Sequence, residues 1–357
     1  MDIKPFKDLK VTTMTLVSGF SGTINLHPIF CLLPITKIDI PEKKRNAKKM
    51  KIPHCDIPGS ILSLRFAGYT RGIYRSVSKT HFRNSITIDI STKVKNISLK
   101  LSESKIQMCG PTSMEMGKEA ISHLFNHIRK IQEELEYMQS VPNDTMSTVK
   151  WLTIHTKGEP TTRELKEVKQ CKNVNLAVVE TYDDFKVVIP SEEDLCKAEK
   201  GGSIDRRVAN FFLRLCPEFN YHSELCEDFD HVLDLDYVLS GDLKCGTIFK
   251  AMVNYNYRLG FKINRSRLKT VFSESEDKWT ARFDPRLDHT VTLQIPYEVP
   301  ERMRFMRKPN KVHCHTLMVQ KSGVVTQSGP DDEMMKEAYL AFMKLIQQNK
   351  KYIEIVE

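Results

Sequence analysis

The chain has 357 residues, of which 40% are hydrophobic and 28% charged, and its formal net charge at pH 7 is +9. This composition is typical of a soluble globular protein and allows one large domain or two to three smaller ones. No apolar run reaches the ~18 residues that a membrane span needs, and the first residues lack the apolar core of a signal peptide, so we expect no membrane partner. The nine cysteines are scattered without paired spacings, and we expect reduced thiols.

Charge is distributed unevenly along the sequence. Residues 141–245 contain 13 Lys and Arg against 20 Asp and Glu, a net charge of −7, whereas the remainder contains 41 against 25, a net of +16. A basic flank around an acidic middle indicates that different parts of the chain meet different partners. The basic part favours a polyanion such as nucleic acid.

The first 140 residues read as a strand, a helix, several strands and a long helix. A strand-like run ends at Ile24, and Asn25 then suits a helix N-cap. The basic run at 41–52 has three possible interpretations: an arm that contacts phosphates, a nuclear-localisation patch, or a solvated loop. The later strands are expected at 60–68, 85–91, 96–102 and 105–110.

The middle of the chain is the hardest to interpret. Residues 176–190 predict two strands and a turn, and 203–216 predict a helix. An acidic cluster between Glu224 and Asp236 could hold Mg²⁺, but apolar residues recur through it at helical spacing, so we favour the charged face of an amphipathic helix. The spacing of Cys216, His222, Cys226 and Cys245 fits no zinc motif, and His313 with His315 would give only two ligands. We therefore expect no metal and no cofactor.

The last part of the chain repeats the order of the first. From Val253 to Phe261, alternate residues are apolar, which predicts a strand with one buried and one exposed face. Asn264 then suits a helix N-cap, and further strands are expected at 279–285, 290–296, 314–320 and 324–329. Asp331 or Asp332 can cap a final long helix.

The two copies align at Gly110-Pro111 on Gly329-Pro330. In the helices that follow, Ala120, Leu124 and Ile128 match Ala338, Phe342 and Ile346 at positions i, i+4 and i+8. Strands that share one face with two helices form an α+β layer, and neither copy covers its sheet well alone. We therefore predict two repeats joined in one antiparallel sheet: 1–140, a mixed acidic insertion at 141–245, and 246–357.

This duplicated order resembles the family of the TATA-box-binding protein. The resemblance is clearest at NISLKLSESKIQMCGPTSMEMGKEAISHLFNHIRK, residues 96–130, and covers roughly 1–140 and 246–357. The sequence FRNSITIDIS…KIQMCGP is more similar to the divergent family members of large nucleocytoplasmic DNA viruses than to the cellular ones. The resemblance implies a curved, saddle-shaped sheet with helices on its convex face and minor-groove binding by its concave face, with apolar wedges that kink the duplex.

Carried over residue by residue, the resemblance also implies which side chains bind DNA. Leu101 and Val319 stand where the family has its intercalating residues in the hairpin strands. The implied set is Thr13, Thr15, Val17, Leu99, Leu101, Lys105, Gln107, Cys109, Asn254, Asn256, Arg258, Leu317, Val319, Thr326 and Ser328.

The sequence lacks the P-loop, GxSxG, HExxH and Rossmann glycine patterns, so we expect no enzyme. We predict a protein that binds double-stranded DNA in viral transcription initiation. Transcription factors or RNA polymerase subunits would contact the acidic insertion, and the protein would lie in the host nucleus or a cytoplasmic viral factory, or be packaged in the virion. The alternative is a structural or protein-interaction module that keeps the saddle but lacks sequence-specific DNA binding.

Overall fold

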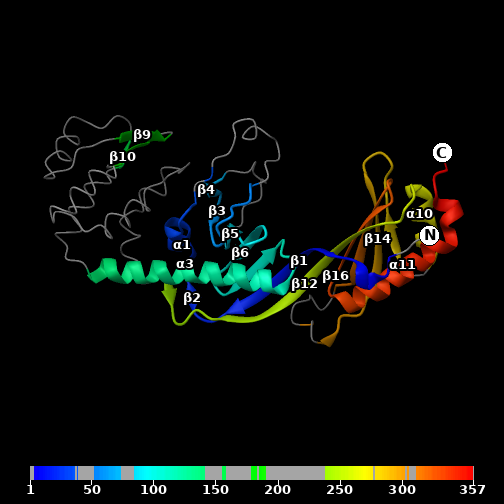
Figure 1. Cartoon of the computed structure of the whole chain (residues 1–357), viewed down its shortest axis with the longest axis horizontal. Helices are drawn as coiled ribbons and strands as arrows, with labels where there is room; N and C mark the ends of the chain where they lie inside the picture. Colours follow the sequence, from blue (N-terminus) through cyan, green and yellow to red (C-terminus); the bar gives the residue numbers. More distant parts are fainter. Residues whose placement is uncertain are drawn as a thin grey trace. The chain divides into compact units, whose positions relative to one another are not determined.

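The computed structural model describes residues 4–36, 38, 52–73, 84–140, 155–157, 178–182, 185–189, 238–275, 278–301, 304 and 311–356 (Figure 1). The chain divides into two compact units. Unit 1 comprises Met1–Val17, Met108–Gly117 and Ile248–Glu357, and unit 2 comprises Ser18–Gln107 and Lys118–Thr247. Antiparallel strands with a few helices build both units, which confirms the predicted α+β class.

Unit 1 contains a sheet covered by helices on one side. Its strands are hydrogen-bonded in the order β13-β14-β15-β16-β12-β1, and a short 3₁₀ helix, η1, precedes β1. The helices α10 and α11 contact β13, β14 and β16. The bounds are η1 (Phe6–Asp8), β1 (Val11–Phe20), β12 (Cys245–Arg258), α10 (Arg265–Ser275), β13 (Thr280–Arg282), β14 (Thr290–Tyr297), β15 (His313–Gln320), β16 (Val324–Gly329) and α11 (Asp332–Ile353), with β1 and β12 each extending into unit 2.

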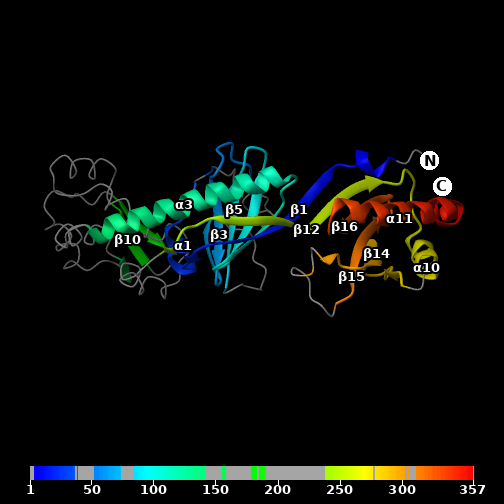
Figure 2. The same cartoon turned by 90° about the horizontal axis from the view of Figure 1, so that it is seen from below.

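Strand alternation decides which side of this sheet the helices cover. Along β12, Val253, Tyr255 and Tyr257 are buried, whereas the residues between them are at least partly exposed, as period two requires. The apolar stripe of α11 packs on the buried side, because residues such as Phe342 and Ile346 recur at helical spacing. α11 contacts β16, and Figure 2 shows the two elements beside each other.

Side-chain caps begin α10 and α11 where the sequence predicts, whereas Asn25, before the helix that starts at Leu26, makes no side-chain cap hydrogen bond. Asn264 Oδ1 accepts a hydrogen bond from the backbone N–H of Arg267 at 3.2 Å, and Asp331 Oδ1 accepts from Met334 N at 3.0 Å. Each cap satisfies an N–H group that the first helical turn leaves without a partner.

Unit 2 contains antiparallel strands in the order β7-β6-β5-β3-β4, which belong to the same 11-stranded sheet as the strands of unit 1. Arg71, buried on β4, donates to the backbone oxygens of Phe30 and Leu33 and so holds the C-terminal end of α1. The bounds are β2 (Thr23–Ile24), α1 (Leu26–Leu32), β3 (Ile61–Phe66), β4 (Tyr69–Gly72), β5 (Ile86–Ser91), β6 (Asn96–Leu101), β7 (Lys105–Cys109), α3 (Met114–Ser140) and β11 (Leu239–Ser240); the ends of β7 and α3 belong to unit 1, and β11 pairs with β2.

The order of elements is the same in the two copies that the sequence predicts. A long strand, β1 or β12, is followed by a helix, then by antiparallel strands, then by a long helix. The neighbours of the long strand also correspond, because β1-β7-β6-β5-β3 matches β12-β16-β15-β14-β13.

Little of the acidic middle lies within the described residues. The strands β8 (His155–Lys157), β9 (Val178–Tyr182) and β10 (Phe185–Ile189) pair in the order β8-β10-β9, and the β9-β10 hairpin confirms the two strands predicted at 176–190. The basic run at 41–51, the predicted helix at 203–216 and the acidic cluster fall outside the described residues. Among the helices that are described, none combines the length and apolar character of a membrane span.

Candidate nucleic-acid interface

The side of the unit 1 sheet opposite the helices carries two rows of polar side chains, which we call the polar face. Strand pairing fixes the rows, since residues directly opposite each other on neighbouring strands point to the same side. The first row is Thr280, Gln294, Thr316, Ser328, Asn254 and Thr13, and the second is Arg282, Thr292, Met318, Thr326 and Asn256.

The polar face is accessible and lacks negative charge. Every residue of the two rows is at least partly exposed. The rows contain amides, hydroxyls, one thioether and the guanidinium of Arg282, and Arg258 extends from the same side of β12. No Asp or Glu stands in either row, although the chain contains 45 acidic residues. Such a surface offers hydrogen-bond donors and acceptors without repelling an anion.

Asn254 links the two long strands on this face. Its Nδ2 donates to Thr13 Oγ1 at 2.9 Å, and the two residues are 241 positions apart in the sequence. Its Oδ1 is buried from water and has no hydrogen-bond partner. An unpaired buried acceptor is costly in free energy.

The start of α11 holds a charged cluster in which the negative charge is neutralised. Asp332 accepts hydrogen bonds from Lys250 Nζ at 2.8 Å and from the hydroxyl of Tyr255 at 2.7 Å. Burial alone would raise the pKa of Asp332, but these hydrogen bonds bring it below the ordinary value. Burial and the neighbouring carboxylate both raise the pKa of Tyr255, so this phenol remains a neutral donor.

Most of the predicted DNA-facing residues lie on exposed sides of their strands. The predicted residues on β1 and β16 are partly exposed, those on β12 are partly or fully exposed, and those on β7 are exposed. Their roles in binding stay predictions. The residues are Thr13, Thr15, Val17, Asn254, Asn256, Arg258, Thr326, Ser328, Lys105, Gln107 and Cys109.

Four predicted residues lie on the wrong side of the sheet. Leu99 and Leu101 on β6, and Leu317 and Val319 on β15, have no exposed surface and belong to the cores beneath the helices. Their assignment to the open face was therefore wrong by one position in each strand, and a shift of one residue moves every side chain of a strand to the other face.

Several residues on the open side of β13, β14 and β15 are absent from the set that the sequence implies. On β15 the exposed positions are Thr316, Met318 and Gln320, and β14 and β13 add Gln294 and Arg282. The alternation of apolar and polar residues in HCHTLMVQ would have found them, because Leu317 and Val319 mark the buried side. Met318, 39% exposed, is the large apolar side chain of the second row.

In unit 2 the corresponding side of the sheet is partly covered by the chain itself. Asn96 Nδ2 donates to the backbone oxygen of Pro53 at 2.7 Å, and Cys55 N donates to Ser91 Oγ at 3.3 Å. The carboxylate of Asp89 is also buried there, 4.0 Å from the guanidinium of Arg65. The polar face of unit 1 is therefore the better candidate for a ligand.

The possible metal ligands give no cluster within the described residues. No group of three or more His, Cys, Asp or Glu there could hold a metal ion. His315 is buried and lies against Tyr297 with ring centroids 4.7 Å apart and the planes tilted by 45°, and Cys245 Sγ lies 3.3 Å from Ser18 Oγ. The other residues of the zinc hypothesis, Cys216, His222 and Cys226, lie outside the described residues.

Comparison with known proteins adds little. No protein-family model matches the chain, and no curated protein sequence matches it. Among solved structures, "Methanococcus jannaschii TBP" matches with 10% sequence identity and a TM-score of 0.35, over 95% of this chain and 98% of that chain. At that TM-score the likeness carries no argument about fold or function.

Proposed function

We propose that the protein binds double-stranded DNA through the polar face of unit 1 and acts without catalysis. The observation that carries this proposal is the pair of polar rows without a carboxylate across the strands β13 to β12. Amides, hydroxyls and guanidinium groups are the side chains that contact phosphates and groove edges in protein–DNA complexes. The net charge of +16 outside the acidic middle supports the same partner.

The dimensions of the polar face fit a short stretch of duplex. The first row crosses β13, β14, β15, β16, β12 and β1, so it spans about 24 Å at the usual distance between strands. That length corresponds to roughly seven base pairs at 3.4 Å each. The matching strand orders of the two copies support a duplicated, saddle-type architecture of this surface.

We propose Met318 as the residue that inserts between base steps, in place of Leu101 and Val319. It lies in the second row between its cross-strand partners Thr292 and Thr326, and the residue is 39% exposed. Apolar side chains, Met included, can insert between base steps from the minor groove. Leu101 and Val319 cannot do so, because both are fully buried.

A salt series of binding to an AT-rich duplex and to a random duplex tests the proposal. The variant is Asn254→Ala/Asn256→Ala, and the matched control is Gln347→Ala/Gln348→Ala, which removes two exposed amides from α11. We expect the first variant to weaken binding by about tenfold or more, because two hydrogen-bonding amides are lost, and the control to bind as the wild type does.

Each other outcome has a definite meaning. Equal weakening by both variants would place the contact elsewhere. A lack of binding at low salt would contradict the DNA proposal and favour a protein partner for the polar face. Melting curves of both variants check that the substitutions leave the fold intact.

The biological setting is a further proposal that rests on charge and resemblance alone. On these grounds we propose a role in viral transcription initiation, contacts of residues 141–245 with transcription factors or polymerase subunits, and a location in the nucleus, a viral factory or the virion. Co-purification of the full chain and of a chain lacking 141–245 from infected cells, with the bound proteins compared, tests the contact of the acidic segment.

A further inference from the structure

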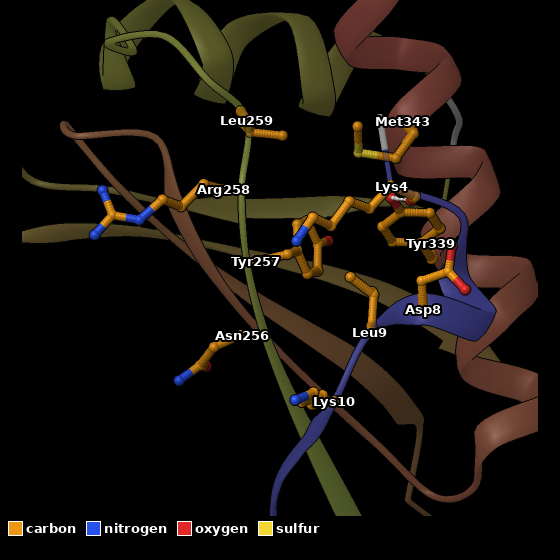
Figure 3. A pocket seen from close by; sticks show the side chains of 10 residues that line it. All are labelled: Lys4, Asp8, Leu9, Lys10, Asn256, Tyr257, Arg258, Leu259, Tyr339 and Met343. Carbon is orange, nitrogen blue, oxygen red and sulfur yellow. Dashed lines mark hydrogen bonds between the residues drawn. The ribbon is translucent and has the colours of Figure 1, made fainter. Parts of the chain in front are cut away.

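Unit 1 contains a pocket that shares Asn256 and Arg258 with the polar face but is otherwise lined by residues that the DNA proposal does not use. It lies between the N-terminal segment around η1, the end of β12 and the helix α11 (Figure 3). Its volume is about 450 Å³, within the range of pockets that bind small molecules. The lining residues are Lys4, Asp8, Leu9, Lys10, Asn256, Tyr257, Arg258, Leu259, Tyr339 and Met343.

The wall of the pocket is aromatic and apolar. Tyr257 and Tyr339 lie edge to face, with ring centroids 5.1 Å apart, and both are buried. Their hydroxyls are already used, because Tyr257 donates to Gln327 Oε1 at 3.0 Å and Tyr339 donates to the backbone oxygen of Lys4 at 2.7 Å. Leu259 and Met343, which are also buried, complete the apolar lining.

The rim of the pocket is basic. Lys4 and Lys10 are exposed and lie on the tyrosine side of β12, whereas Arg258 and Asn256 extend from its other side (Figure 3). Asp8 is the one carboxylate among the residues that line the pocket. The ion pairs within the described residues do not include Lys4 or Lys10. Both ammonium groups can therefore bind an anion.

Together these features select a ligand with a flat apolar part and a negative group. A cation would be repelled by the two lysines, and a small inorganic anion would leave the aromatic wall unused. We propose that this pocket binds one nucleotide, with its base against Tyr257 and Tyr339 and its phosphate at Lys4 and Lys10. The nucleotide is either free or the terminal nucleotide of a DNA strand.

Calorimetric titration of the full chain with AMP, adenosine and inorganic phosphate tests the ligand chemistry. We expect AMP to bind more tightly than either part alone. The variant Lys4→Gln/Lys10→Gln should weaken AMP binding by about tenfold or more, because charge-assisted hydrogen bonds are lost. The matched control Lys336→Gln/Lys344→Gln removes the same charge from exposed positions on α11 and should leave AMP binding unchanged.

The methyl signal of Met343 reports where the ligand binds. In a protein labelled at the Met methyl groups, AMP should shift this signal, which the variant Met343→Leu assigns by its absence. The sources of the nucleotide are separated by comparing a blunt duplex with one that carries a single-nucleotide overhang. A shift with AMP alone indicates a free nucleotide, and a larger shift with the overhang than with the blunt duplex indicates a strand end.

Several results would overturn the nucleotide site. These are an absence of AMP binding at millimolar concentration, phosphate binding as tight as AMP binding, or equal losses in the lysine variant and its control. The DNA proposal fails separately, because Asn254→Ala changes the polar face but no residue that lines the pocket. AMP binding by Asn254→Ala at wild-type strength is therefore the expected result.

Discussion

His315 lies on the helix-covered side of β15, with 3% of its surface exposed and no hydrogen-bond partner for Nδ1. Burial lowers its pKa to about 4, against the weaker opposing effect of Asp331. Since this folded-state pKa is below the unfolded value of 6.5, the unfolded chain binds the proton more readily. The stability that neutral His315 contributes is complete above pH 6.5 and is lost as the pH falls toward 4.

We therefore expect the free energy of unfolding to fall by up to about 3 kcal/mol between pH 7.5 and pH 4 through this residue. Urea unfolding across that range, for the wild type and for His315→Gln, measures the effect. The variant cannot titrate at this position, so its curve should be flatter. Parallel pH dependence in both proteins would show that other groups control acid stability.

Gly329 packs so closely against its neighbours that no room is left for a larger side chain. A Cβ at this position would lie 2.5 Å from His315 Nδ1 and 2.6 Å from Met335 Cγ, between β15 and the start of α11. We expect Gly329→Ala to destabilise the protein by about 1 to 3 kcal/mol through overpacking. Ser328→Ala, one position earlier on the open side, should change the unfolding midpoint little, and equal effects in thermal melts would argue against this packing.

At the scale of the element, β15 presents neighbouring residues to opposite environments. Leu317 is fully buried and Met318 is 39% exposed on the polar face. Leu317→Ala should lower the free energy of unfolding by about 2 to 5 kcal/mol, because it leaves a cavity in the core. Met318→Ala should leave stability nearly unchanged and weaken DNA binding. Denaturant unfolding and DNA titration of both variants separate the two roles.

Most strands of both copies could be predicted from the sequence, because period-two alternation and Gly or Asn at the ends mark them directly, but β4 (Tyr69–Gly72) was missed. The alternation in β12 also places Asn254 and Asn256 on the open side correctly. In β6 and β15 the family resemblance implies an open-side position for Leu99 and Leu317, but the local alternation of apolar and polar residues places both on the buried side, as the structure does. The pocket at Tyr339 could not be predicted, since it needs three segments far apart in the sequence to meet.

At the scale of the whole molecule, the distribution of charge limits how DNA can bind. The rows of the polar face contain one cation, Arg282, with Arg258 beside them, whereas the chain outside 141–245 has a net charge of +16. If the polar face makes the contact, about two to four phosphates are neutralised. The slope of log K against log salt concentration should then be about −2 to −4.

Fluorescence anisotropy between 50 and 300 mM salt measures this slope. A slope near −10 would instead point to a diffuse basic surface and would disagree with the polar-face proposal. Arg258→Gln should make the slope less steep by about one, whereas Asn256→Ala should lower affinity at every salt concentration without changing the slope.

The hydrogen bond between Thr13 and Asn254 also determines when unit 1 can form during synthesis. The two residues are 241 positions apart, so at about 5 to 20 residues per second the ribosome needs roughly 10 to 50 seconds to make the second after the first. During that interval the beginning of β1 has none of its β12 partners. Its apolar residues Leu16 and Met14, which are buried in the folded protein, must therefore be shielded from water in the meantime by a chaperone or by the growing chain itself.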